Sequence, residues 1–210
     1  MRTLMAVAAL LVVGWSLCVN GCAGSGHVYQ YAEPWNTGLK DIDNCFLNRG
    51  LLTHEVIDSL GRKLISENKA HLHIDSVILE RIRDDRDGWA CSWQQTQNGV
   101  PVQFSQIGIM IRGDGTVWSS GAEIFPDVRC ATVPHISGAQ AREIVIKDFG
   151  CEKFEIREEP ALVILPERLD TVVYHLTWKM KISKIPAPET IYFVGVDDGR
   201  VILRRKLEWQ

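Results

Sequence analysis

A two-residue turn signal between two alternating segments constrains the fold of this chain more than any other feature. Residues 89–97 read WACSWQQTQ and alternate in polarity, and residues 100–104 read VPVQF. Between them stand Asn98 and Gly99, the pair that a type I′ turn favours because both central residues need a positive φ. The pattern predicts an antiparallel hairpin, with Pro101 at an edge or a bulge because it lacks an amide donor.

The segments around this hairpin extend it into a sheet with a helix before it. Further strands are predicted at 76–83, 107–112 and 116–121, and a Gly-Asp-Gly turn separates the last two. Residues 53–67 place apolar side chains at helical spacing, with Thr53 as the N-cap. The first half of the chain therefore predicts a helix followed by an antiparallel sheet.

The second half repeats this order. Residues 136–150 form the clearest helical pattern, with Ser137 and Gln140 at capping-box spacing and Gly150 at the C-terminal cap. Strands are predicted at 161–166, 171–182, 190–196 and 200–209, with a turn at Asp198-Gly199. The fold class expected is α+β, with two modules that each pack an antiparallel β-sheet against a helix.

The first 22 residues have the layout of a secretory signal peptide. A single positive charge at Arg2 precedes an apolar run that is shorter than the roughly 20 residues of a membrane-spanning helix. The run ends before Cys22, in a context that resembles a bacterial lipobox except for Asn20. We expect lipidation of Cys22 and a membrane anchor in the cell envelope. Ordinary cleavage, giving a soluble secreted or periplasmic protein, is the alternative. Residues 23–49 then read as a tether and N-terminal segment.

Export changes the interpretation of the remaining cysteines. Beyond Cys22 the chain has four cysteines, namely Cys45, Cys91, Cys130 and Cys151. An even number in an oxidising compartment predicts two disulfide bonds, with three pairings open. The rival interpretation is a zinc site, which lacks a C-x-x-C spacing or a neighbouring histidine.

Catalytic and nucleic-acid-binding patterns are missing from the sequence. The net charge of −3 offers no basic excess to neutralise phosphates. The segment HEVID resembles a metallopeptidase helix, but Asp58 stands where the second histidine ligand is needed. His71 and His73 alternate on one predicted strand and could meet a metal, although no third ligand is visible. We therefore expect no enzyme activity, no cofactor and no metal.

The two halves resemble modules of secreted metallopeptidase precursors. Residues 89–128, with their glutamine-containing strand, VPV arm and Asp-Gly turn, resemble the fungalysin/thermolysin-type propeptide. The segments 174–182 and 190–205, with a Leu-x-Trp strand and an Asp-Gly hairpin, resemble a PepSY module. The resemblance divides the chain into a propeptide-like module at 50–130 and a PepSY-like module at 131–210. Such modules assist folding of the attached enzyme and hold it inactive.

This sequence departs from that family because it carries no H-E-x-x-H motif and has four additional cysteines. The resemblance therefore implies an exported, non-catalytic protein-binding module. It would act in trans as an inhibitor or folding chaperone of a secreted thermolysin-like metallopeptidase. Leu207, Trp209 and Gln210 are the expected partner contacts, with Trp209 as an apolar anchor or else as a packed strand end. The alternative is a structural envelope lipoprotein with no peptidase partner.

Overall fold

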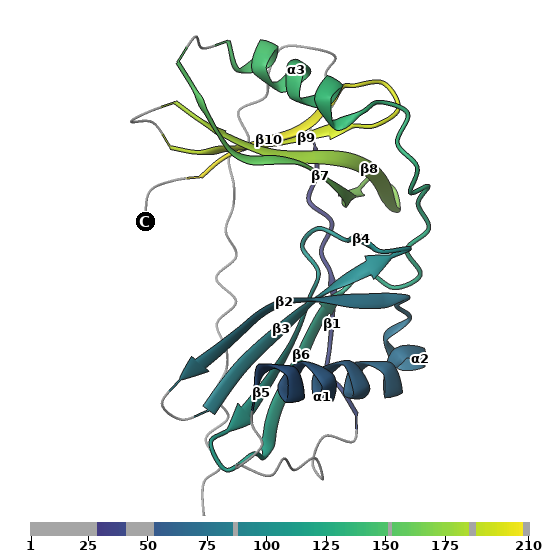
Figure 1. Cartoon of the computed structure of the whole chain (residues 1–210). Coiled ribbons are helices and arrows are strands. Elements are labelled where there is room, and N and C mark those ends of the chain that lie inside the picture. Colours follow the sequence, from purple (N-terminus) through teal and green to yellow (C-terminus); the bar gives the residue numbers. More distant parts are fainter. Residues whose placement is uncertain (1–28, 41–52, 86–87, 151–152, 185–187, 208–210) are drawn as a thin grey trace, which may run out of the picture.

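The computed structural model describes residues 29–40, 53–85, 88–150, 153–184 and 188–207. These residues form two antiparallel sheets, each with a helix on one face (Figure 1). The predicted α+β fold class is confirmed. Among the described residues, no helix is both long enough and apolar enough to cross a membrane.

The first unit contains a six-stranded sheet. Its elements are β1 (Trp35–Thr37), α1 (His54–Glu67), α2 (Lys69–Leu72), β2 (Ser76–Asp85), β3 (Gly88–Gln97), β4 (Val100–Pro101), β5 (Gln106–Arg112) and β6 (Val117–Ile124). The strand order is β1-β6-β5-β3-β2, and the short β4 pairs with β3. The strand β2 therefore lies at one edge of this sheet.

The second unit is a four-stranded meander. Its elements are α3 (Gly138–Phe149), β7 (Glu155–Arg168), β8 (Val172–Ser183), β9 (Thr190–Gly195) and β10 (Val201–Lys206). Consecutive strands are neighbours, in the order β10-β9-β8-β7. The helix buries Ala141 and Val145 against Met180 and Tyr192 of the sheet.

Both predicted long helices begin and end where local signals place them. The Thr53 side chain accepts a hydrogen bond from the Val56 amide at the start of α1. Ser137 and Gln140 form the complete capping box of α3, and Gly150 ends that helix at φ 62°. These caps pair amides and carbonyls that a helix terminus otherwise leaves unbonded.

The α1 helix packs very closely on the sheet at Gly61. A Cβ atom at this position would lie 2.1 Å from the ring of Trp93, which is fully buried in the first core. Only a residue without a side chain allows this approach. The glycine that weakens the helix by propensity is therefore needed for its packing.

The hairpin turns confirm the sequence prediction, but the arm after Asn98-Gly99 does not continue as a strand. Asn98 and Gly99 have φ values of 49° and 80°, as a type I′ turn requires. Pro101 has no amide to donate, and the chain leaves the first sheet after Val102, whose amide still donates to the Gln95 carbonyl of β3. The Gln103 amide instead donates to the Ile164 carbonyl on β7, 2.8 Å away. This segment therefore joins the two units.

The N-terminal segment (residues 29–37) also joins the two units, although the sequence assigned it to a tether. Arg168 of β7 donates its amide to the Gln30 carbonyl, and Tyr31 forms an isolated bridge with Glu167. A few residues later, β1 pairs with β6 of the first sheet. The tether interpretation is wrong for this segment, since Tyr29 and Ala32 are buried.

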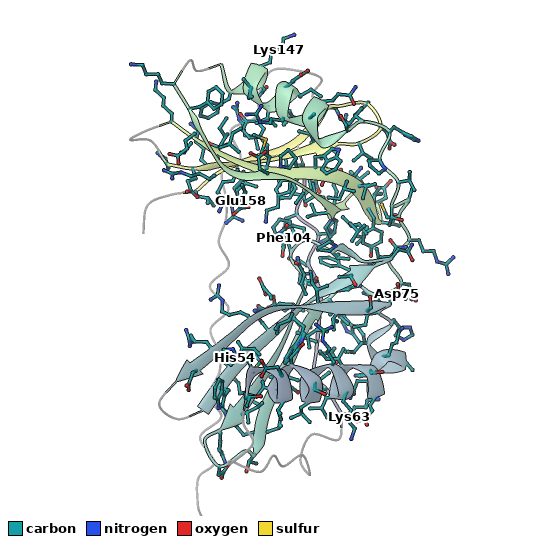
Figure 2. The ribbon with its side chains drawn as sticks, in the orientation of Figure 1. His54, Lys63, Asp75, Phe104, Lys147 and Glu158 are labelled. Carbon is teal, nitrogen blue, oxygen red and sulfur yellow. The ribbon has the colours of Figure 1, made fainter. Side chains whose placement is uncertain are left out.

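Phe104 is the clearest single contact between the units (Figure 2). It adopts a left-handed conformation at φ 67°, which is rare for a residue with a bulky side chain. Its ring lies 4.9 Å from that of Tyr31 and 6.5 Å from that of Phe193, measured between centroids. Packing across the junction thus holds a strained backbone in place.

Candidate functional site

The first sheet has one face that α1 covers and one face that remains open. On β5, Ile107, Ile109 and Ile111 are buried in the core under α1. Successive side chains of a strand alternate between the two faces, so Gly108 and Met110 belong to the open face. Figure 1 shows α1 on the opposite side of this sheet.

Small residues occupy the middle of this open face. Strand register places Gly108 beside Ser92 of β3 and Gly121 of β6, and it places Met110 beside Ala90 and Ser119. A Cβ atom added at Gly121 would meet no other atom within 4 Å. The missing side chains leave a hollow of about 580 Å³.

Charged groups surround this hollow. Arg81 and Arg83 of β2 line it on one side and Glu123 lines it on the other. Near the hairpin end of the same face, the Arg112 guanidinium lies 5.7 Å from the centre of the Trp118 ring. Trp118 is half exposed, so an aromatic surface is available beside the charged rim.

The strand β2 forms a free edge next to the hollow. It pairs only with β3 among the described strands, and its ladder shifts register between Leu79 and Arg81. Ile78 and Leu79 are 39% and 36% exposed. The Arg62 side chain donates to the Val77 carbonyl at 3.0 Å and thereby occupies the beginning of the edge. An extended chain could add to the rest of this edge by backbone pairing.

A second hollow of about 400 Å³ lies where β3 ends. His73 and Asp127 line it, both in the left-handed conformation, and the Asp127 amide donates to the His73 carbonyl at 3.0 Å. The buried polar residues in its wall already have partners: Gln95 bonds Phe125, and Thr96 bonds the Ser76 hydroxyl. We assign this hollow a structural role.

The glutamines of β3 hold the junction together. Gln95 is 1% exposed, and its side-chain amide accepts from the Phe125 amide and donates to the Phe125 carbonyl, at 3.0 and 2.7 Å. Gln94 donates to the segment after β4, and Gln97 accepts from the segment that leads to α3. The run therefore fixes two connecting segments, the one after β4 and the one between β6 and α3, and needs no catalytic explanation.

The residues of the HEVID segment are structural. Asp58, which stands where a zinc helix needs histidine, accepts a hydrogen bond from the Trp93 ring nitrogen at 2.8 Å and pairs with Arg62. The His54 ring lies edge-on against Trp89. Within the described ranges, no group of three or more histidine, cysteine or acidic side chains could hold a metal ion.

The other histidines are also dispersed. His71 lies in α2 and His73 caps that helix, so the prediction that they alternate on a strand is wrong. The reason is the left-handed turn at His73, which ends the helix before β2 begins. His175 of β8 pairs with the buried carboxylate of Glu167 at 2.9 Å.

Two of the four candidate disulfide cysteines lie in the described part of the chain, and both are free thiols. Cys91 lies in the first core and Cys130 in the loop before α3, where its sulfur contacts the Tyr174 carbonyl. The structure therefore differs from the expected disulfides at these two positions. Cys45 and Cys151 lie outside the described residues.

The environment of each thiol disfavours its thiolate. Burial raises the pKa of Cys91 to about 11, and the nearby Asp58 carboxylate adds to the effect. Burial also raises the pKa of Cys130, with a smaller contribution from Asp197. Both sulfurs are thus protonated at neutral pH, which makes them poor nucleophiles and poor metal ligands.

The predicted contacts at the end of the last strand are described only in part. Leu207 is half-buried, and its amide donates to the Glu189 carbonyl at 2.7 Å, next to the end of β10. Trp209 and Gln210 lie outside the described residues, as does Cys22. Their proposed roles remain predictions.

Sequence reasoning did not identify the open face of the first sheet. The signal was present as small residues at alternate positions in three strands: Ala90 and Ser92, Gly108, and Ser119 and Gly121. In each strand taken alone, these residues are typical of an ordinary solvent-facing side. Only the register between strands shows that the small residues meet.

Comparison with known proteins adds little to this description. No family model matches the chain, and no curated protein matches it. A solved structure, the Bacillus megaterium YpeB C-terminal domain, aligns with 16% sequence identity and a TM-score of 0.43. The alignment covers 80% of this chain and 69% of that chain. A likeness of this size assigns neither a family nor an activity.

Proposed function

We propose that this chain is an exported, non-catalytic module that binds another protein through the open face of its first sheet. The observation that carries the proposal is the hollow of about 580 Å³ over small residues, next to the free edge of β2. An uncovered sheet face with exposed Met110 and Trp118 is typical of a surface that a partner covers.

The chemistry of the described residues supports binding rather than catalysis. The two described thiols are held protonated by burial. The Asp58 carboxylate binds a tryptophan and an arginine instead of standing free. Backbone pairing along β2 and side-chain burial in the hollow require no reactive group.

The partner that we propose is a secreted thermolysin-like metallopeptidase, bound in trans as an inhibitor or folding chaperone. The support is the resemblance of residues 89–128 and 174–205 to propeptide modules. A partner of this kind has an exposed polypeptide surface large enough for a standard interface, which buries roughly 1,200–2,000 Å² in total.

Gly121→Leu tests both the partner and the surface. A Cβ atom at this position has no other atom within 4 Å, so a leucine can extend into the hollow and the fold should be retained. Calorimetric titration against a thermolysin-like peptidase without its own propeptide should show binding by the unaltered protein. The variant should bind at least about tenfold more weakly, which corresponds to 1.4 kcal/mol.

Ala139→Leu is the matched control, because it adds a leucine side chain on the exposed surface of α3 in the other unit. It should bind as the unaltered protein does. If the unaltered protein neither binds the peptidase nor improves its refolding, the peptidase is not the partner, and an envelope role becomes the better hypothesis. If Gly121→Leu binds with full affinity, the open face is not the interface.

We also propose that lipidation of Cys22 anchors the protein in the cell envelope. The support is the short apolar run that ends in a lipobox-like context. Cells that express Cys22→Ser should release the protein from the membrane fraction. Release of the unaltered protein in fully soluble form would contradict the anchor and leave export in place.

A further inference from the structure

We propose that the segment which a partner lays along β2 is acidic, with carboxylates at alternate positions opposite Arg81 and Arg83. This inference rests on the proposed function, because it names the chemistry of the segment that the open face receives. It also extends that proposal from the hollow to the free edge beside it.

The two arginines lie on the same face of the same strand. Arg81 is in register with Ser92 and Arg83 with Ala90, and both of those residues belong to the open face. Alternate residues of a strand are about 6.6 Å apart, and an added strand has the same repeat. Carboxylates at alternate positions of a partner strand therefore meet both guanidinium groups at once.

No carboxylate in the described part of the chain forms an ion pair with either arginine. Both arginines are exposed, and neither has a carboxylate within ion-pair distance among the described residues. Glu80 also lines the hollow, and its carboxylate accepts a hydrogen bond from the Ser92 hydroxyl at 3.2 Å instead of pairing with either arginine. Asp84 is in register with Trp89, on the face that α1 covers.

The geometry of β2 limits which chain can pair with it. The register shift after Leu79 and the Arg62 contact at Val77 leave a regular edge only from Arg81 onward. In a second copy of this chain, paired antiparallel across that regular edge, Arg81 would face Arg83 of its partner if the pairing were centred on Ile82, and the two copies of Arg83 would face each other if it were centred on Arg83. Like charges directly opposite each other are destabilising. Opposite charges in the same positions are stabilising, which favours an acidic segment.

Fluorescence anisotropy with two labelled octapeptides tests the inference. One peptide alternates glutamate with valine, and the other replaces each glutamate with lysine. The acidic peptide should bind at least about tenfold more tightly at low ionic strength, and its affinity should fall as salt is added. The double variant Arg81→Glu/Arg83→Glu should reverse this preference.

A matched control changes the same net charge elsewhere. Arg142→Glu/Lys147→Glu alters two exposed positions on α3, and Figure 2 shows Lys147 on the outer side of that helix. This variant should retain the preference for the acidic peptide. Circular dichroism and thermal unfolding should show that both double variants are folded.

Four results would overturn the inference. The first is equal affinity of the unaltered protein for the two peptides. The second is a loss of preference for the acidic peptide in the α3 control that is as large as the loss in Arg81→Glu/Arg83→Glu. The third is a dimer, measured by light scattering, that Arg81→Glu/Arg83→Glu converts to a monomer, because a second copy would then occupy the edge. If Gly121→Leu weakens peptidase binding while the arginine variant does not, the acidic segment is rejected and the open face stands.

Discussion

Replacing Gln95 by leucine tests whether the glutamines of β3 hold the junction. Gln95 is 1% exposed and makes two hydrogen bonds to the backbone of Phe125, which is itself 2% exposed. Leucine has a similar size but cannot bond either group. Each buried group left without a partner costs about 1–3 kcal/mol, so the variant should lose roughly 2–6 kcal/mol of unfolding free energy.

Urea denaturation followed by far-ultraviolet circular dichroism measures this loss. Gln97→Leu is the control, because Gln97 is half-buried and accepts a single bond, from the Cys130 amide. It should cost about 0.5–1.5 kcal/mol. A loss below about 1 kcal/mol for Gln95→Leu, or one no larger than that of the control, would refute the argument that its two bonds fix the segment after β6.

Three further predictions concern single positions. Gly99→Val should destabilise the protein by about 1–2 kcal/mol in the same assay, because a β-branched residue resists a φ of 80°; an unchanged midpoint would contradict the type I′ turn. Gly61→Ala should lower the melting temperature although alanine favours helices, since its Cβ would strike the Trp93 ring; a raised melting temperature would contradict this packing. Native Cys91 should resist iodoacetamide at pH 8, because burial raises its pKa to about 11 from an ordinary 9.0. Unfolding free energy should then fall between those two pH values, where only the unfolded thiol has lost its proton, and Cys91→Ala should make that decline smaller.

The elements that follow local rules could be predicted from the sequence. Thr53, Ser137 and Gly150 cap their helices through groups a few residues away, and Asn98-Gly99 sets its own turn. Such signals depend on neighbouring residues, which a single sequence contains. The α+β class followed from them because each half has a helix followed by a run of strands joined by tight turns.

Other features depend on contacts between distant residues, and no local signal could predict them. Tyr29 donates its hydroxyl hydrogen to the Pro166 carbonyl, 137 positions away, so its burial is invisible in a polar-aromatic stretch. The left-handed turn at His73 converted a predicted strand into a helix end. The free state of Cys91 likewise reflects the core that surrounds it rather than the oxidising compartment that the proposed export implies.

The N-terminal segment has a mechanical consequence. It pairs first with β7 of the second unit, at Gln30 and Tyr31, and then continues as β1 along β6 of the first unit. Tension applied upstream of residue 29 would therefore reach the second unit before it reached the first. The backbone contacts of Gln30 and Tyr31 with β7 would bear this force first. The β1–β6 pairing and the open face beside it would bear no force until those contacts broke.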